Sequence, residues 1–208
     1  MNAKEMEKLT DHFERCFGQK AATVMRNKAE TELPIDILVF APTGRYPFWK
    51  LCTRGASDYR MPKREGVRYR ETATLQNEYM MFLDPTVRIE EGSDDWLWYW
   101  QILTETAMFP FSNRMGVIAT DIIDLGREQD TMQGVILLFP EVIEDTSILQ
   151  CRMGLGRNVT CLQVMPVTKR ELERRIDGTD ADDDWLYSQF YHHDPMRPDR
   201  FIAQRERD

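Results

Sequence analysis

Residues 47–59 read PFWKLCTRGASDY, an aromatic and apolar run that changes abruptly into a short polar loop. The run up to Thr53 favours a β-strand inside a sheet, because aromatic and long apolar side chains fit a pleated, buried surface. Gly55 permits backbone angles that other residues resist, and Ser57 and Asp58 commonly hydrogen-bond to nearby amides in turns. The stretch therefore predicts a strand that ends at Thr53 and leads directly into a tight loop.

Further runs of the sequence have the length and composition of strands, and Gly or Pro residues bound most of them. They comprise 35–40, 78–83, 117–120, 134–139 and 159–165. The run 134–139 is apolar almost throughout, which indicates a fully buried strand. Gly154 and Gly156 fall in a predicted turn between two strands.

Helical signals lie before, between and after these strands. Apolar residues recur at three- and four-residue steps over 6–21, which predicts an amphipathic helix that packs on the sheet. A second helix is predicted over 96–109 with Ser93 as its cap, and the Thr-x-x-Glu spacing at 168–171 matches a capping box. The acidic run 180–184 indicates the start of a last short helix.

This order of elements predicts an α+β fold, in which α-helices flank a mixed β-sheet. A chain of 208 residues is long enough to build one domain with a full core. We expect residues 1–191 to form a single domain. Residues 192–208 are expected to form a polar C-terminal tail, either mobile or draped over the domain.

The composition narrows the class of partner. With 35 acidic and 27 basic residues, the formal net charge is -8, which repels phosphate backbones and anionic lipid head groups. Nucleic acid and membranes are therefore not expected as partners. A basic protein would be attracted, although moderate acidity also serves solubility alone. The 4 cysteines are too sparse for a disulfide scaffold and no signal peptide is recognisable, which predicts a cytoplasmic protein with reduced thiols.

The sequence contains no recognisable pattern of catalytic residues. Of the 3 histidines, His12 lies in the first predicted helix, and His192 and His193 lie near the polar tail. Ser57 is followed by Tyr59 at the position where a nucleophile elbow requires glycine. We therefore expect no catalytic residues, no metal site and no cofactor.

Aromatic residues crowd the start of the second predicted helix at Trp96, Trp98, Tyr99 and Trp100. Successive helical positions point in different directions, so these side chains cannot all face the sheet. Trp100 is expected in the core. Trp96 and Tyr99 are the candidates for an exposed patch that contacts a partner.

The segment TRGASDY, from Thr53 to Tyr59, resembles the T-x-G-x-S motif region of the suppressor-of-fused domain family. Other parts of that family's pattern follow in the same order. They comprise EYMMFL at 78–83, the tryptophan-containing helix at 96–110, GVILLFP at 134–140 and LQVMPVTKRE at 162–171. The resemblance covers roughly residues 30–180 and depends on the order of several short motifs.

The resemblance implies an α+β protein-binding module without catalytic residues. A chain of this length looks like the stand-alone bacterial members of the family, many of which are proposed immunity proteins. It therefore implies an inhibitory protein that neutralises a toxin partner, and an acidic chain would suit a basic toxin surface.

Two roles are open for the loop. Thr53, Gly55 and Ser57 can shape the turn, while Asp58 and Tyr59 can be presented to a protein partner. The alternative is a small-molecule-binding or enzymatic domain, with a pocket near Ser57, Asp58 and Tyr59.

Overall fold

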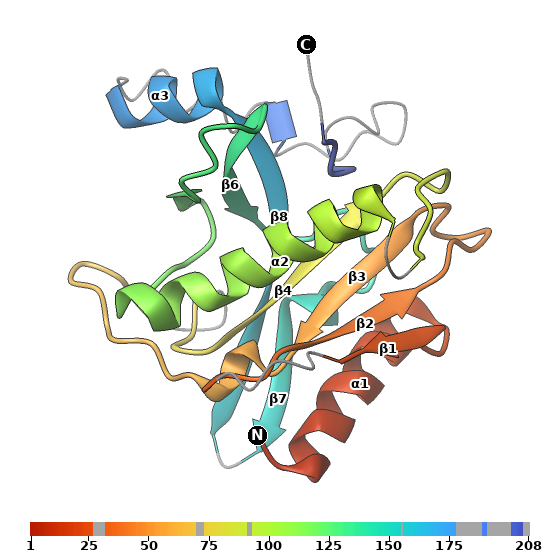
Figure 1. Cartoon of the computed structure of the whole chain (residues 1–208). Helices are drawn as coiled ribbons and strands as arrows, with labels where there is room; N and C mark the ends of the chain where they lie inside the picture. Colours follow the sequence, from red (N-terminus) through yellow and green to blue (C-terminus); the bar gives the residue numbers. More distant parts are fainter. Residues whose placement is uncertain are drawn as a thin grey trace.

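The structure is a computed structural model of the chain, drawn in Figure 1. It describes residues 1–26, 32–69, 73–90, 93–154, 156–177, 189–190 and 201–205.

Within these residues, a mixed sheet of eight strands forms the centre of the fold (Figure 1). The strands are β1 (Thr23–Met25), β2 (Asp36–Phe40), β3 (Trp49–Arg54), β4 (Asn77–Leu83), β5 (Ile122–Asp124), β6 (Met132–Leu138), β7 (Gln150–Gly154) and β8 (Arg157–Thr168). Their order across the sheet is β1-β2-β3-β4-β8-β6-β5, and β7 pairs with the first part of β8. β4 and β8 run parallel, whereas the other pairs are antiparallel. The predicted mixed sheet is confirmed.

The described residues form three α-helices, namely α1 (Ala3–Phe17), α2 (Asp94–Asn113) and α3 (Lys169–Asp177). Two of them start at the capping residues that the sequence predicts. Ser93 Oγ accepts a hydrogen bond from Trp96 N at 3.3 Å, which caps α2. At α3, Thr168 Oγ1 accepts from Glu171 N at 3.3 Å while the glutamate accepts from Thr168 N at 2.7 Å. Each pair satisfies amides that the first helical turn leaves free.

The sheet carries a hydrophobic core on each face. Along β4, Tyr79 and Met81 join the core beneath α2, whereas Met80 and Phe82 join the core that includes Phe13 of α1. Successive side chains of a strand point to opposite faces, so this fully apolar stretch serves both cores. Figure 1 shows α2 lying across one face of the sheet. The predicted α+β class, with helices flanking a mixed sheet, is confirmed.

The strand prediction at 117–120 is wrong. Thr120 has a φ of 77°, and Asp121 Oδ2 accepts a hydrogen bond from Ile118 N at 2.8 Å. Residues 117–120 therefore lead into a turn, and the next strand of the sheet begins only after it, at β5. The sequence also fails to predict β1 and β7, because β1 has only three residues and β7, QCRMG, has few apolar ones.

The prediction that Trp96 and Tyr99 form an exposed patch is wrong. Their exposed fractions are 4% and 6%, because α2 turns a broad face toward the sheet. Leu97 lies on the outer side with 47% exposure, and Trp100 is only half-buried. Apolar residues of this helix lie on all of its sides, so the sequence pattern does not indicate which side packs on the sheet.

The stretch 201–205, within the predicted polar tail, lies against the end of β4 and the middle of β8. Ala203 N donates to Phe82 O at 2.7 Å, and Gln163 Nε2 donates to Phe201 O at 2.8 Å. This part of the predicted tail is therefore draped over the domain. The last predicted helix, after 180–184, lies outside the described residues apart from Gln189 and Phe190.

A lysine is buried in the core on the α1 face. Lys50 has an exposed fraction of 0%, and its Nζ donates to the carbonyls of Ala41 at 2.9 Å and Phe48 at 3.0 Å. Its Nζ also lies 5.4 to 5.9 Å from the ring centroids of Phe48, Tyr46 and Phe17. No ion pair to this ammonium group is present among the described residues. Burial lowers the pKa of Lys50 to about 8.

Candidate functional site

A buried carboxylate on β4 holds the loop that follows β3. The strand leads directly into the short 3₁₀ turn η1 (Ala56–Asp58), and Glu78 on the neighbouring strand is 0% exposed. Its Oε2 accepts a hydrogen bond from Thr53 Oγ1 at 2.6 Å. Its Oε1 accepts from Gly55 N at 3.0 Å, Ser57 N at 3.0 Å and Ser57 Oγ at 2.7 Å. One side chain therefore binds all three named residues of the T-x-G-x-S segment.

These hydrogen bonds fix the shape of the loop. Hydrogen bonds to a charged group contribute roughly 1.5–3 kcal/mol each, and an unpaired buried carboxylate is costly. The Thr53 hydroxyl also accepts from Tyr79 N at 2.8 Å, so it links the loop to the backbone of β4. The loop and the two central strands consequently form one rigid unit.

Besides the hydrogen bonds of Glu78, the backbone conformation of Gly55 shapes the loop. Its φ is 129°, and a Cβ atom at this position would lie 2.3 Å from the carbonyl oxygen of Pro34. Both the backbone angle and the close approach exclude a side chain here.

We therefore expect Gly55→Ala to lower the free energy of unfolding by at least about 2 kcal/mol, because the new methyl group adds backbone strain and a clash. Chemical denaturation of the two proteins measures this difference. Gly44→Ala is a suitable control, because a Cβ atom there meets nothing within 4 Å. Equal losses in the two variants would contradict the prediction.

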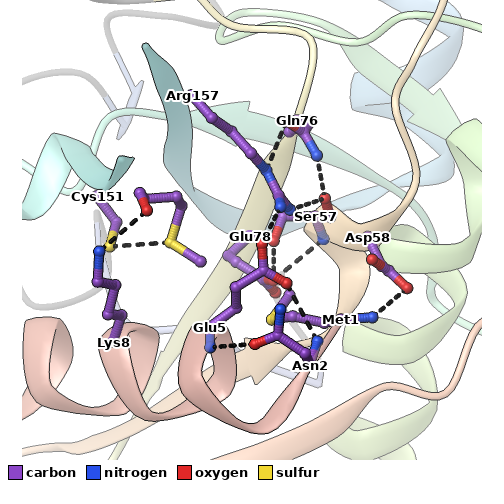
Figure 2. Close-up of polar contacts among 11 residues, drawn as sticks. Met1, Asn2, Glu5, Lys8, Ser57, Asp58, Gln76, Glu78, Cys151 and Arg157 are labelled. Atoms are coloured by element: carbon purple, nitrogen blue, oxygen red, sulfur yellow. Dashed lines mark hydrogen bonds and ion pairs between the residues drawn. The ribbon is translucent and has the colours of Figure 1, made fainter. Parts of the chain in front are cut away.

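A second layer of polar contacts joins this loop to α1 and to the start of β8 (Figure 2). Gln76 Nε2 donates to Ser57 O at 2.5 Å, and Arg157 donates to the same carbonyl at 3.2 Å and to Gln76 Oε1 at 3.0 Å. The Arg157 guanidinium also pairs with Glu5 of α1 at 2.5 Å. Segments far apart in the sequence thus hold the turn from outside.

Asp58 and Tyr59 lie at the outer end of the loop. The Asp58 side chain is 42% exposed and forms an ion pair with the amino group of Met1. Tyr59 is half-buried, with its ring edge-to-face against Phe111 at a centroid distance of 5.4 Å. The rigid turn therefore places one acidic and one aromatic side chain beside each other at the surface.

The structure does not bring the four predicted contact residues together. Tyr59 packs at the C-terminal end of α2 through Phe111, whereas Trp96 and Tyr99 lie at the N-terminal end. A rise of 1.5 Å per residue separates these ends by roughly 20 Å. Only Asp58 and Tyr59 remain as accessible candidates.

The arrangement around Ser57 does not favour nucleophilic catalysis. The Ser57 side chain is 0% exposed, so a substrate cannot reach its hydroxyl. A hollow of about 560 Å³ lies beside Tyr59, but neither Ser57 nor Asp58 is among its lining residues. This hollow therefore does not gather the three residues that the alternative small-molecule or enzymatic hypothesis places near one pocket.

Other reactive groups in the described part of the chain are also buried. Burial lowers the pKa of His12 to about 4 and raises the pKa of the Cys161 thiol, so neither is poised for catalysis near pH 7. All four cysteines are buried and form no disulfide. No group of three His, Cys, Asp or Glu side chains within the described ranges is placed to hold a metal ion.

Two residues that hold the loop, Glu78 and Arg157, are not predicted from the sequence. Glu78 directly precedes the apolar run 79–83 of β4, and a carboxylate beside such a run is a usable signal because unpaired charges are almost never buried. Arg157 has no comparable signal, because its partners come from three separate segments.

Taken together, the sheet and the loop define a class of α+β domain in which a buried glutamate fixes a T-x-G-x-S turn. The family model described as Suppressor of fused protein (SUFU) matches residues 31–180, which is most of the chain. The chain therefore belongs to the suppressor-of-fused family. Proteins of this family are protein-binding modules and are generally not enzymes.

Solved structures of similar fold include three from this family. A suppressor-of-fused homologue from Neisseria gonorrhoeae has a TM-score of 0.64 at 10% identity, covering 92% of this chain and 93% of that one. A chain of the Sufu–Fu complex gives 0.62 at 15% identity, with coverage of 98% and 91%. Drosophila Suppressor of Fused gives 0.63 at 17% identity, and 99% of this chain matches 50% of that protein. These likenesses show the fold.

No curated protein matches the chain. None of the helices in the described ranges has the length and apolar character that a bilayer crossing requires.

Proposed function

We propose that the chain is an inhibitory protein-binding module whose contact surface is centred on Asp58 and Tyr59. The observation that carries this proposal is the loop itself: a buried carboxylate fixes its inner residues, while its outer end presents these two side chains. Loops held by a rigid scaffold are common binding sites.

Rigidity of the loop favours binding for an energetic reason. Ordering a side chain or a loop during association costs about 0.5–1.5 kcal/mol for each immobilised side chain. A turn that is already fixed by Glu78 and Gly55 avoids most of this cost. Aromatic residues are also enriched among the side chains that dominate binding energy, which favours Tyr59 as the main contact.

The finer proposal is that the partner is a toxin and that the chain is its immunity protein in a bacterial cytoplasm. The resemblance to stand-alone members of the family supports this role. The net charge of -8 would favour encounter with a basic toxin surface. The Sufu–Fu complex shows that a protein of the same fold binds another protein.

The double variant Asp58→Ala with Tyr59→Ala tests the proposed surface. We expect loss of partner capture with a change in Tm of only a few degrees, because both side chains lie at the surface end of the loop. The assay is co-purification with the product of the neighbouring toxin-like gene, together with protection of cells that express it. Asp11→Ala, on the exposed side of α1, is the control and should leave capture unchanged.

Two results would contradict the proposed function. One is full partner capture by the double variant. The other is the absence of both a complex and cell protection for the unmodified protein.

A further inference from the structure

The loop that follows Tyr59 is basic, in contrast to the acidic chain as a whole. Arg60, Lys63, Arg64 and Arg68 all lie on its exposed side. Arg64 is paired, with its guanidinium against Asp121 at 2.5 Å. No ion pair to Arg60 or Lys63 occurs within the part of the chain that the structure describes.

A hollow of about 840 Å³ lies between this loop, the start of β4 and the β7–β8 hairpin. We call it the basic hollow. Its polar lining includes Arg60, Lys63, Tyr69, Gln76, Arg157 and Asn158. No Asp or Glu occurs among the described residues that line it. Since Arg157 already pairs with Glu5, Arg60 and Lys63 supply the unpaired positive charge.

Arg60 also reaches the hollow beside Tyr59. That second hollow is lined by Tyr59, Arg60, Phe111 and Arg114, with Glu32 as its one acidic residue among those described. The two hollows therefore meet at Arg60, next to the aromatic residue of the proposed contact surface. We call this place, where the two hollows meet, the Arg60 corner. It brings cationic side chains close to the aromatic rings of Tyr59 and Phe111.

The loop that carries these cations is anchored. Met61, between Arg60 and Lys63 in the sequence, is 4% exposed, and its backbone nitrogen donates to Leu75 O at 2.8 Å. The neighbouring Pro62 carbonyl packs so closely on Gly116 that a Cβ atom there would lie 2.6 Å away. The backbone positions of the two cationic residues are thus fixed before any ligand arrives, which reduces the ordering cost of binding.

We propose that the basic hollow is the docking site for a short acidic segment of a protein partner. The proposal rests on the protein-binding function above and names the chemistry of one part of that interface. Charges act over about one Debye length, ~8 Å at physiological ionic strength, so a bound segment senses the Arg60 corner rather than the net charge of the chain. A partner that is basic elsewhere can therefore still carry the acidic segment. Long nucleic acids are disfavoured because they extend beyond the hollow over an acidic molecule.

The direct test is an NMR titration of the ¹⁵N-labelled protein with a decapeptide of alternating glutamate and glycine. We expect shifts confined to amides of the loop 59–69 and of the β8 start, and binding that weakens as salt rises from ~50 to ~300 mM. A decapeptide of alternating lysine and glycine should not cause these shifts.

A matched pair of charge reversals separates the local effect from the net charge. Arg60→Glu with Lys63→Glu should weaken binding of the glutamate peptide by about tenfold or more. Lys169→Glu with Arg170→Glu, on α3, lowers the net charge by the same amount and should have little effect. Far-UV circular dichroism and Tm of both variants check that they are folded.

Several outcomes would overturn the proposal. They are the absence of shifts with the glutamate peptide, equal weakening in both double variants, or tighter binding of a single-stranded oligonucleotide with the same charge. Suppose that one of these outcomes occurs and partner capture still depends on Asp58 and Tyr59. Docking of an acidic segment in the basic hollow would then be ruled out, whereas the proposed protein-binding function would stand. Loss of that dependence would instead count against the proposed function itself.

Discussion

Glu78→Gln is expected to lower the free energy of unfolding by roughly 3–5 kcal/mol, because hydrogen bonds to a charged group contribute roughly 1.5–3 kcal/mol each and at least two of the four that this carboxylate accepts are weakened or lost. The glutamine carbonyl can replace only one carboxylate oxygen. Its NH₂ group would face either the Thr53 hydroxyl or the donors of Gly55 and Ser57. For a chain of 150–250 residues this loss corresponds to a fall in Tm of roughly 10 °C.

Urea denaturation of the variant and the unmodified protein measures this effect. Glu7→Gln makes the same chemical change on the exposed side of α1 and should cost less than about 0.5 kcal/mol. If Glu78→Gln does not fold, Ser57→Ala is a milder test, because it removes only the serine hydroxyl donor and leaves the serine amide and the other donors in place. We expect that variant to fold and to lose about 1–2 kcal/mol. Stability equal to the unmodified protein in both variants would contradict the role assigned to Glu78.

The same carboxylate shows how far the sequence could predict the site. Gly55 and Ser57 could be assigned to a tight turn, because glycine and serine have known turn chemistry. The residue that holds the turn could not be assigned, since Glu78 lies more than twenty positions later. Its contact with the loop depends on the pairing of β3 with β4, where Cys52 lies opposite Met80. Local patterns contain no information on this register.

The fold itself was largely predictable where strands are long and apolar. The runs at 35–40, 78–83 and 134–139 lie within one residue of β2, β4 and β6 at most of their ends. Their composition leaves little choice, because such runs must be buried on both faces of a sheet. The prediction failed at 117–120, where the turn at Thr120 depends on a side-chain contact of Asp121 rather than on the apolar residues themselves.

The helix α2 shows a different limit of prediction from the sequence. Trp96, Leu97, Trp98, Tyr99 and Trp100 place apolar residues on every side of its first turns. Periodicity then gives no preferred face, and the sheet beneath decides which residues are buried. The large apolar residue that remains exposed on this helix is Leu97, at 47%. Only tertiary packing identifies Asp58 and Tyr59 as the accessible pair.

Lys50 provides the second large effect, which appears as a dependence of stability on pH. Its pKa is about 8 in the folded protein, because burial disfavours the charged ammonium group, whereas an unfolded lysine has a pKa near 10.4. Between these values the unfolded chain binds more protons than the folded one, so stability rises with pH. We expect Lys50 to add about 2 kcal/mol to the free energy of unfolding as pH rises from ~7 to ~9.5. Below the folded pKa this contribution is absent, because both states are protonated.

The comparison with Lys50→Met isolates this contribution, because tyrosine and cysteine groups that also titrate at high pH are common to both proteins. The stability of the unmodified protein minus that of the variant should rise by about 2 kcal/mol over this pH range. Lys4→Met, at an exposed position on α1, provides the control and should give a nearly constant difference. A flat difference for Lys50→Met would mean that the buried ammonium group is as well solvated by its carbonyl partners as by water. The rings around it would then contribute more through cation–π attraction than their 5.4 to 5.9 Å distances indicate.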